Sequence, residues 1–343
     1  MSRIIRLSED RRGHVDKDPA LTADADGRLW VAWHSYREKE DRILIRSFKG
    51  NRRGKVLEIS DRPGINFQPK IACDGHTVWV VWVAMREDRW CILARSVTSR
   101  GMGAVVRLSE NEAEEAFPAV ATGACGRIWA AWTSLGNGRR QVFGRFLSDG
   151  TWSDPILLSS GSGEHYRPVL CGDTDGVWLA YGTCRKGAYD LYVRQWTPEG
   201  IGRPSKFSLT DSWELFPRLC ADGEGGVWAA WAATHDVMDD RGIVDHKVDL
   251  MASHFDGKGW TPYRSSGRNR PIGYVTHLYD ALLGREHYWG FLGWRRRPQL
   301  VREADGDVWV LYERKEDESA NRHGPDAAFY ARSLTGKGRS RSY

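Results

Sequence analysis

The chain has 343 residues, a formal net charge of +5, and 28% charged and 41% hydrophobic side chains. This mixed, mildly basic composition does not indicate nucleic-acid binding, which usually requires a concentrated basic face. The N-terminus lacks the apolar core of a secretion signal and no segment is apolar enough to span a membrane, so we expect a cytoplasmic protein without a membrane partner, although a trimmed chain would look the same.

One motif recurs along the chain: a proline opens an apolar run, an Asp/Gly turn follows, and a Trp-x-x-Trp or Trp-x-x-Tyr segment completes it. The prolines are Pro19, Pro69, Pro118, Pro168, Pro217 and Pro298. The leading tryptophans are Trp30, Trp79, Trp129, Trp178, Trp228 and Trp309, separated by 49, 50, 49, 50 and 81 residues. A nearly fixed period that holds four short strands predicts an all-β fold, a six-bladed β-propeller of four-stranded antiparallel blades.

The first repeat shows how each strand is predicted. Residues 19–23 form an apolar run whose proline stands at the strand start, where a missing N–H costs little. Residues 24–27 (Asp-Ala-Asp-Gly) have the composition of a tight turn. Residues 28–33 and 42–48 are rich in β-branched and aromatic side chains, and residues 55–60 form a fourth strand whose final Ile-Ser recurs in later repeats. Residues three apart on a strand point to opposite faces, so Trp30 and Trp33 should face different neighbours.

The six repeats together predict one domain over residues 1–343. Its blades begin near residues 19, 69, 118, 168, 217 and 298. The sixth repeat ends without a fourth strand, and the opening segment, residues 3–8, matches the missing one. We therefore expect the N-terminal strand to complete the last blade and close the ring, which removes an exposed sheet edge.

The six cysteines follow the blade registers rather than paired spacings. No Cys-x-x-Cys motif is present, so free thiols are expected in preference to disulfides or a metal site.

Three interruptions of the repeat fall in the last two blades. From the second aromatic residue of the motif to the end of the third strand is 15 residues in blades one, two and four, but 24 in blade five and 22 in blade six. From that point to the next proline is 21 residues in blades one, two and four but 43 after blade five, which predicts an insertion at residues 267–297. In an antiparallel blade these connections emerge on the same face, where long loops on a rigid scaffold tend to carry function.

These insertions supply candidate functional side chains. The blade-five loop, residues 235–249, holds two histidines and five aspartates, including the candidate ligand-binding residues His235, Asp236 and His246. Carboxylate and imidazole groups suit a divalent cation, but EF-hand and zinc spacings are absent and a solvated acidic loop is the alternative, so no cofactor is assigned. The candidate catalytic residues His277, Tyr279 and His287 lie in the large insertion, and the blade-six loop contributes His323.

The residues just before each proline form a second group, because they enter the innermost strands close to the predicted axis. They include Asp16, Lys17, Asp18, Asn66, Gln68, His165, Tyr166, Arg167, Arg295, Arg296 and Arg297. Arg167 and Arg297 are candidates to converge on a carboxylate or sulfate ligand, for which the guanidinium fork is suited. Pairing with local acids such as Glu164 or Glu214 is the alternative.

The repeat resembles the Trp/Asp-rich blades of bacterial propellers described as sialidase-like, BNR-like or TolB-like, and the resemblance covers nearly the whole chain. Sialidases carry an Asp-box between the third and fourth strands. The nearest match here, residues 22–30, has an extra residue and joins strands one and two. The Arg-Ile-Pro signature is also absent, so sialidase activity is not predicted. Propeller-fold polysaccharide lyases resemble the chain more loosely, through their His, Tyr and Arg residues on one face.

Binding of a polar, acidic saccharide on the loop face of blades five and six is the function that these residues favour. A glycan-active enzyme, either a polysaccharide lyase or a glycoside hydrolase, is the first alternative. In a lyase, Arg167 and Arg297 would neutralise a uronate carboxylate, His277 or His287 would act as base, and Tyr279 as acid. A protein-interaction scaffold, or the leading domain of a longer protein, is the second alternative. Phosphate-loop, nucleophile-elbow and His-Glu-x-x-His motifs are absent from the sequence.

Overall fold

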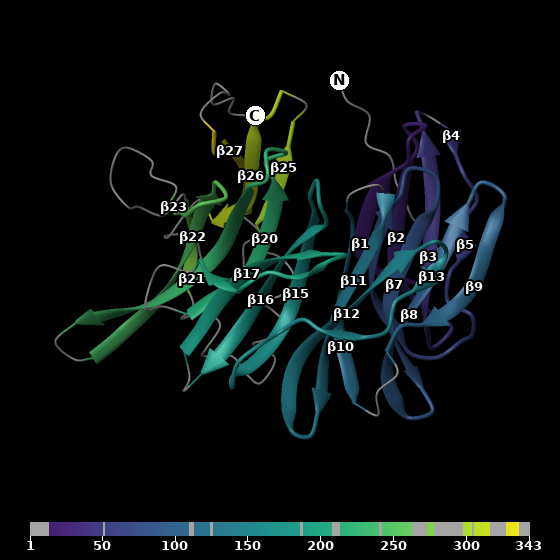
Figure 1. The fold of residues 1–343 in the computed structure, drawn as a ribbon, viewed down its shortest axis with the longest axis horizontal. Helices are drawn as coiled ribbons and strands as arrows, with labels where there is room; N and C mark the ends of the chain where they lie inside the picture. The colour runs from purple at the N-terminus through teal and green to yellow at the C-terminus, as the bar shows by residue number, and fades with distance from the viewer. Residues whose placement is uncertain are drawn as a thin grey trace. The chain divides into compact units, whose positions relative to one another are not determined.

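The computed structural model describes most of the chain. The described residues are 14–50, 52–109, 113–123, 126–185, 188–207, 213–239, 242–262, 273–277, 298–303, 305–315 and 327–335. These residues form β-strands and no α-helix, which confirms the all-β prediction (Figure 1). A helix long and apolar enough to cross a membrane is accordingly not found among them.

The chain separates into two compact units, residues 1–170 with 175–177 and residues 171–174 with 178–343. Within the described residues the strands form six sheets, and every pairing whose register is resolved is antiparallel. The predicted strand of residues 3–8 lies outside the described residues. Ring closure by that strand therefore stays a prediction, as does the single domain over residues 1–343.

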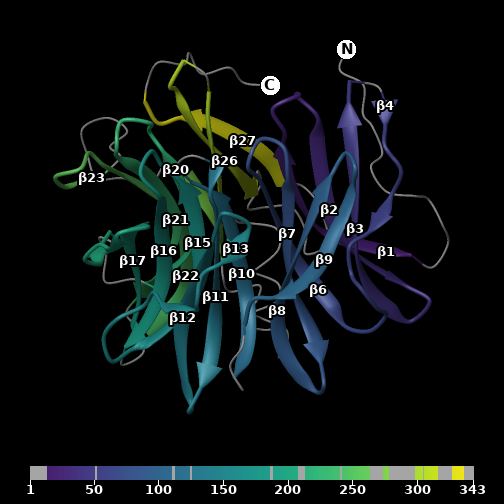
Figure 2. The ribbon, with the colours of Figure 1, turned by 45° about the vertical axis from the view of Figure 1, so that its right-hand side comes forward.

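The first three sheets belong to unit 1. The first has the order β1 (Val15–Ala23), β2 (Leu29–Arg37), β3 (Glu40–Lys49) and β4 (Arg52–Arg53), with β5 (Leu57–Glu58) also paired to β3. The second, shown in Figure 2, has the order β6 (Asn66–Cys73), β7 (Val78–Arg86), β8 (Arg89–Thr98) and β9 (Gly101–Arg107). The third has the order β10 (Glu114–Thr122), β11 (Ile128–Gly136), β12 (Arg139–Ser148) and β13 (Thr151–Trp152), with β14 (Ile156–Leu157) paired to β12.

The fourth and fifth sheets have the same strand order, and the sixth contains three described strands. The fourth has the order β15 (Glu164–Gly172), β16 (Val177–Arg185), β17 (Ala188–Thr197) and β18 (Gly200–Ile201), with β19 (Ser205–Lys206) paired to β17. The fifth has the order β20 (Trp213–Ala221), β21 (Val227–Asp239), β22 (Gly242–Phe255) and β23 (Trp260–Pro262), with β24 (Gly273–His277) paired to β22. The sixth contains β25 (Gln299–Arg302), β26 (Val308–Lys315) and β27 (Ala327–Ser333).

The core lies between neighbouring sheets, because each strand alternates its side chains between two faces. Val80 and Trp82 of β7 pack with residues of the first sheet, whereas Val81 and Val83 pack with residues of the third. Trp30 and Trp33 likewise belong to different clusters, which confirms the prediction that they face different neighbours. In unit 2, Ala230 and Leu250 of the fifth sheet pack with Val308 and Val310 of the sixth.

The repeated Ile-Ser or Leu-Ser pair has a structural role. Ser109 accepts a hydrogen bond through its hydroxyl from the Ile92 N–H at 2.9 Å, and Ser159 does the same for Val142 at 3.0 Å. The fourth strand is shorter than predicted in the first sheet, where residues 55–60 reduce to β5. The ladder nevertheless continues beyond it, because the Ile59 N–H donates to Ile43 O at 2.7 Å.

The prediction of free thiols is confirmed for the cysteines that the structure describes. They are Cys73, Cys91, Cys171, Cys184 and Cys220. Cys125 lies outside the described residues.

Candidate functional site

The first strands of the first five sheets share an irregularity at the proline of the motif. The residue before the proline has a positive φ in five copies: Asp18 (52°), Gln68 (53°), Phe117 (54°), Arg167 (52°) and Phe216 (56°). In each resolved case the pairing to the second strand skips this residue and the proline. A side chain in the left-handed region costs about 1 kcal/mol or more, and a residue before proline is normally extended. The repeat therefore holds one strained residue at the same end of each of these strands.

The position three residues before the proline carries a polar side chain that meets the second tryptophan of the motif. Asp16 accepts a hydrogen bond from Trp33 Nε1 at 3.1 Å. Asn66, which is fully buried, accepts one from Trp82 Nε1 at 3.1 Å and a second from Arg86 Nη2 at 3.2 Å. In the first two sheets this position is therefore part of the scaffold.

The third sheet places Glu115 at the same position. Its side chain is 1% exposed, and Oε1 accepts a hydrogen bond from the Ser134 hydroxyl at 3.2 Å. Burial raises the pKa of the Glu115 carboxyl to about 8, and the hydrogen bond from Ser134 only partly opposes this. The group is therefore mostly a neutral carboxylic acid at pH 7, able to donate a proton.

The first strand of the fourth sheet supplies a histidine and an arginine to the same region of unit 1. His165 is 1% exposed and occupies the position that corresponds to Glu115. The Arg167 N–H donates to Thr133 Oγ1 at 2.9 Å, and its guanidinium carbon lies 4.6 Å from the centre of the Phe117 ring. Burial lowers the pKa of the Arg167 guanidinium, so an anionic ligand beside it would be favoured.

We call this group the β10–β15 cluster. Its members are Glu115, Phe117, Thr133, Ser134, His165, Tyr166 and Arg167. It combines a neutral acid, an imidazole, a phenol and a guanidinium at the bulged ends of two first strands. Glu164, considered from sequence as a partner for Arg167, forms its ion pair with Arg140 at 3.3 Å.

The sequence analysis named His165 and Arg167 as candidates but did not name Glu115. A signal was present, since Glu115 stands three residues before Pro118, as Asp16 and Asn66 stand before their prolines. The raised pKa of Glu115 could not be predicted from the sequence, because it arises from the burial of the carboxyl in the folded structure.

The prediction of a loop in blade five is wrong, because the structure has strands there. Residues 235–239 belong to β21 and residues 242–249 to β22, and the two paired strands are drawn as two long green arrows at the lower left of Figure 1. Continuous pairing explains this, because the register runs unbroken from Val227 to Val237 and satisfies the backbone groups that an open loop would leave to solvent. Asp236 stands opposite His246 in the register.

His277 also lies on a strand rather than in an open insertion. In β24 it stands opposite Lys247 of β22, which in turn stands opposite His235 of β21. Three neighbouring strands therefore bring these backbone positions into one row. The side chains of this hairpin and of β24 lie outside what the structure describes, and so do Tyr279, His287, Arg297 and His323. The divalent cation at residues 235–249 stays a prediction.

No protein-family model matches the sequence, and no curated protein matches it. Solved structures do resemble the fold. An ulvan lyase from a new family of polysaccharide lyases aligns with a TM-score of 0.57 at 10% identity, over 89% of this chain and 80% of that chain. The α-L-arabinanase of Penicillium chrysogenum, complexed with arabinobiose, aligns with a TM-score of 0.52 at 13% identity over 93% of each chain.

The sialidase of Trypanosoma rangeli is a third structure of this kind. It aligns with a TM-score of 0.51 at 10% identity over 93% of this chain, which spans about half of the sialidase, or 54%. At such identities the likeness concerns the fold alone. It supports the predicted sialidase-like β-propeller scaffold.

Proposed function

We propose that the protein is a glycan-active enzyme, built on a six-bladed propeller, whose reaction takes place at the β10–β15 cluster. The observation that carries this proposal is the Glu115 carboxyl, which burial keeps protonated at neutral pH beside strands that also carry His165 and Arg167. Cleavage of a glycosidic bond by hydrolysis or by elimination requires a proton for the leaving oxygen.

Each cluster residue has a role in this proposal. Glu115 is the acid that protonates the leaving oxygen. Arg167 binds a carboxylate of the substrate, and the gain is large because its guanidinium is partly desolvated. Glu115 is buried, so catalysis requires its side chain to turn toward the bound glycan.

Support for catalysis over saccharide binding alone comes from two sources. The three structures named above are, by their own descriptions, an arabinanase, a sialidase and a polysaccharide lyase. A ligand-binding surface also has no need for a carboxyl whose pKa is shifted close to neutrality. Binding without turnover is the competing outcome in the test.

The test is an assay of the purified chain against acidic and neutral oligosaccharides. Ultraviolet absorbance of an unsaturated uronate detects elimination, and new reducing ends detect either reaction. We expect Glu115→Gln to lower kcat/KM by about 100-fold or more while KM changes little, because the variant keeps the shape and loses the proton.

Glu114→Gln is the matched control, since Glu114 is the exposed neighbour on the same strand. It should retain activity. If Glu115→Gln forms product as fast as the unaltered chain does, the assignment of Glu115 as the acid is refuted. Ligand-induced stabilisation without any product would instead favour a binding protein.

A further inference from the structure

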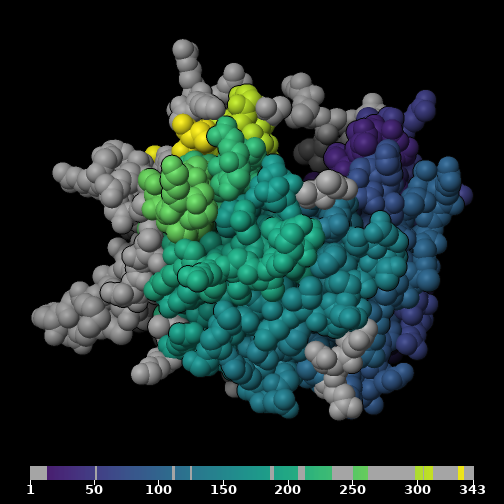
Figure 3. Space-filling model, viewed as in Figure 1, coloured from purple at the N-terminus to yellow at the C-terminus, as the bar shows by residue number. Residues whose placement is uncertain are grey.

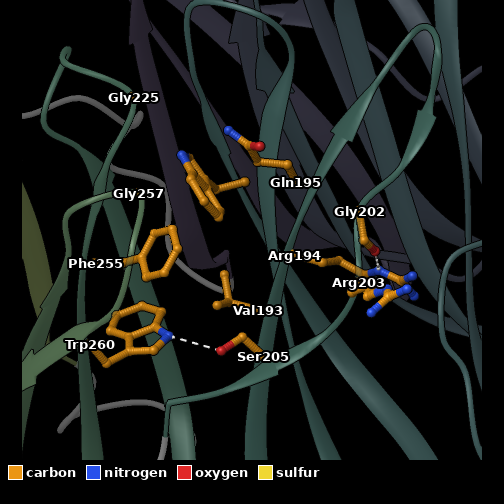
Figure 4. Close-up of a pocket in the computed structure, with 11 residues that line it drawn as sticks. Val193, Arg194, Gln195, Gly202, Arg203, Ser205, Gly225, Phe255, Gly257 and Trp260 are labelled. Atoms are coloured by element: carbon orange, nitrogen blue, oxygen red, sulfur yellow. Dashed lines mark hydrogen bonds between the residues drawn. The ribbon is translucent and has the colours of Figure 1, made fainter.

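The fourth and fifth sheets of unit 2 lie side by side, and Figure 3 shows green atoms of the fifth sheet beside teal-green atoms of the fourth. A crevice of about 210 Å³ lies between them, with Phe255 and Trp260 on one wall at 5.4 Å between ring centres (Figure 4). Figure 4 shows the Arg203 guanidinium pointing away from both rings, and Gln195 Nε2 donates to Asp173 Oδ2 at 3.4 Å. The rings and the polar groups therefore do not converge on one ligand, and the crevice is a packing feature of the two sheets.

The third sheet differs from its neighbours at one position near the end of its second strand. Four residues after the second aromatic residue of the motif stand Arg37 in the first sheet, Arg86 in the second and Arg185 in the fourth, but Gly136 in the third. The first strand of that sheet carries Glu115. The cation of the repeat is therefore missing from the sheet that holds the buried acid.

In the second sheet this arginine contacts the residue three before the proline. Arg86 is 7% exposed, and its Nη2 donates to Asn66 Oδ1 at 3.2 Å. In the first sheet Arg37 instead donates to Ser35 Oγ, from Nε at 3.0 Å and from Nη2 at 2.9 Å. An arginine at this position thus reaches either the side chain three before the proline or the serine that stands opposite that residue in the register.

Gly136 leaves the corresponding serine of the third sheet to the carboxyl. Ser134 stands opposite Glu115 in the register, and its hydroxyl donates to Glu115 Oε1 at 3.2 Å. The backbone does not require a glycine here, because Gly136 has no positive φ and an added Cβ would meet Ala113 Cβ first, at 3.5 Å, an ordinary contact. The consequence of the glycine is therefore the loss of a guanidinium beside Glu115.

The protonation of Glu115 depends on a balance between burial and a few neighbouring groups. Burial raises the pKa of the carboxyl to about 8, whereas hydrogen bonds from Ser134 and Trp132 and the charge of Arg107 lower it. A guanidinium at position 136, placed as Arg86 is placed against Asn66, would favour the charged form further. The other charged or titratable groups on the strands packed around Glu115 are Glu114 of β10, Cys91 of β8, and His165 and Arg167 of β15.

We propose that the absence of an arginine at position 136 keeps the proton on Glu115 at neutral pH, and that Ser134 holds the carboxyl through Oε1. Gly136 and Ser134 are positioning residues, because both act through Glu115. Their role rests on the proposed function, in which Glu115 donates this proton, and it fixes the alkaline limit of that reaction.

The test follows the Glu115 carboxyl carbon by NMR in the full chain grown with isotopically labelled glutamate, and the signal that Glu115→Gln loses identifies it. We expect Gly136→Arg to lower the midpoint of its titration by about 1 to 3 pH units, because a neighbouring guanidinium favours the carboxylate. Ser134→Ala should raise the midpoint by about one pH unit, since it removes a hydrogen bond to the charged form. Ser134→Thr keeps the hydroxyl and should restore the original midpoint.

Gly136→Met is the matched control, because it adds a long side chain without a charge, and it should not lower the midpoint. Gly136→Lys supplies the cation on a different side chain if Gly136→Arg does not fold, which the melting temperature checks. Equal midpoints for the charged variants and Gly136→Met would overturn the role of Gly136. An unchanged midpoint in Ser134→Ala would overturn that of Ser134.

The titration needs no substrate, so its outcome is separate from that of the activity assay. Shifted midpoints without turnover of any glycan would refute the proposed function and leave the effect of Gly136 and Ser134 on the proton standing. Loss of activity in Glu115→Gln with unmoved midpoints would do the reverse. Where turnover occurs, the alkaline limb of the kcat/KM profile should move with the midpoint in each variant.

Discussion

In the first two sheets the residue three before the proline is a partner of the second tryptophan and has an ordinary role in the scaffold, whereas in the third sheet the same position holds a buried carboxyl whose pKa burial raises, although contacts with Ser134 and Trp132 oppose the rise. Asp16 and Asn66 join strands, and Asn66 also holds a buried arginine. Glu115 stands at the same register with a pKa of about 8. One backbone position therefore serves the scaffold in two sheets and carries an unusual acid in the third.

The largest expected effect is on the pH dependence of stability through Glu115. Its folded pKa is about 8 against an ordinary value of 4.5, so its stabilising contribution is complete below the lower value and is lost as pH rises through the upper one. Glu115→Gln should remove this dependence and raise the free energy of unfolding well above pH 8 by up to about 5 kcal/mol relative to the unaltered chain. Urea unfolding at several pH values measures it.

Glu114→Gln again provides the control, since that side chain is exposed and its charge is only a minor cause of the raised pKa of Glu115, so this variant should keep most of the pH dependence. Parallel profiles for the unaltered chain and Glu115→Gln would mean that the carboxyl is ionised in the fold. Glu115 would then have the same structural role as Asp16 and Asn66.

The next effect concerns Asn66, which occupies the corresponding position in the second sheet. Asn66→Ala should destabilise the chain by about 3 kcal/mol, because it leaves the buried Trp82 N–H and Arg86 guanidinium without this acceptor. The change in unfolding free energy from urea titration tests this. A loss below about 1 kcal/mol would show that other groups or water satisfy both donors.

The smallest effect belongs to the first sheet. Asp16→Ala should cost about 1 kcal/mol, since it removes one acceptor from Trp33 at a partly exposed position. Asp16→Asn keeps an acceptor oxygen and should restore most of this loss in the same thermal or urea measurement. Equal losses in both variants would indicate that the charge of Asp16, and not its hydrogen bond, matters.

The candidate site residues came from two sources in the sequence, the repeat itself and its exceptions, and the structure describes the first group in more detail than the second. His165 and Arg167 were found because they precede a proline, and the structure brings both to the bulged end of β15. The loop at residues 235–249 was expected to be open, but its two arms pair as strands, because hydrogen bonding between them satisfies the backbone.

The sequence by itself determined the all-β class, the repeat, and the two faces of the tryptophan strands, since alternation and spacing act locally along each strand. Only the tertiary structure decided the acidity of Glu115, the strained bulges and the aromatic crevice. Each of these depends on how far neighbouring strands exclude water or crowd a side chain, and residues distant in sequence supply that surrounding.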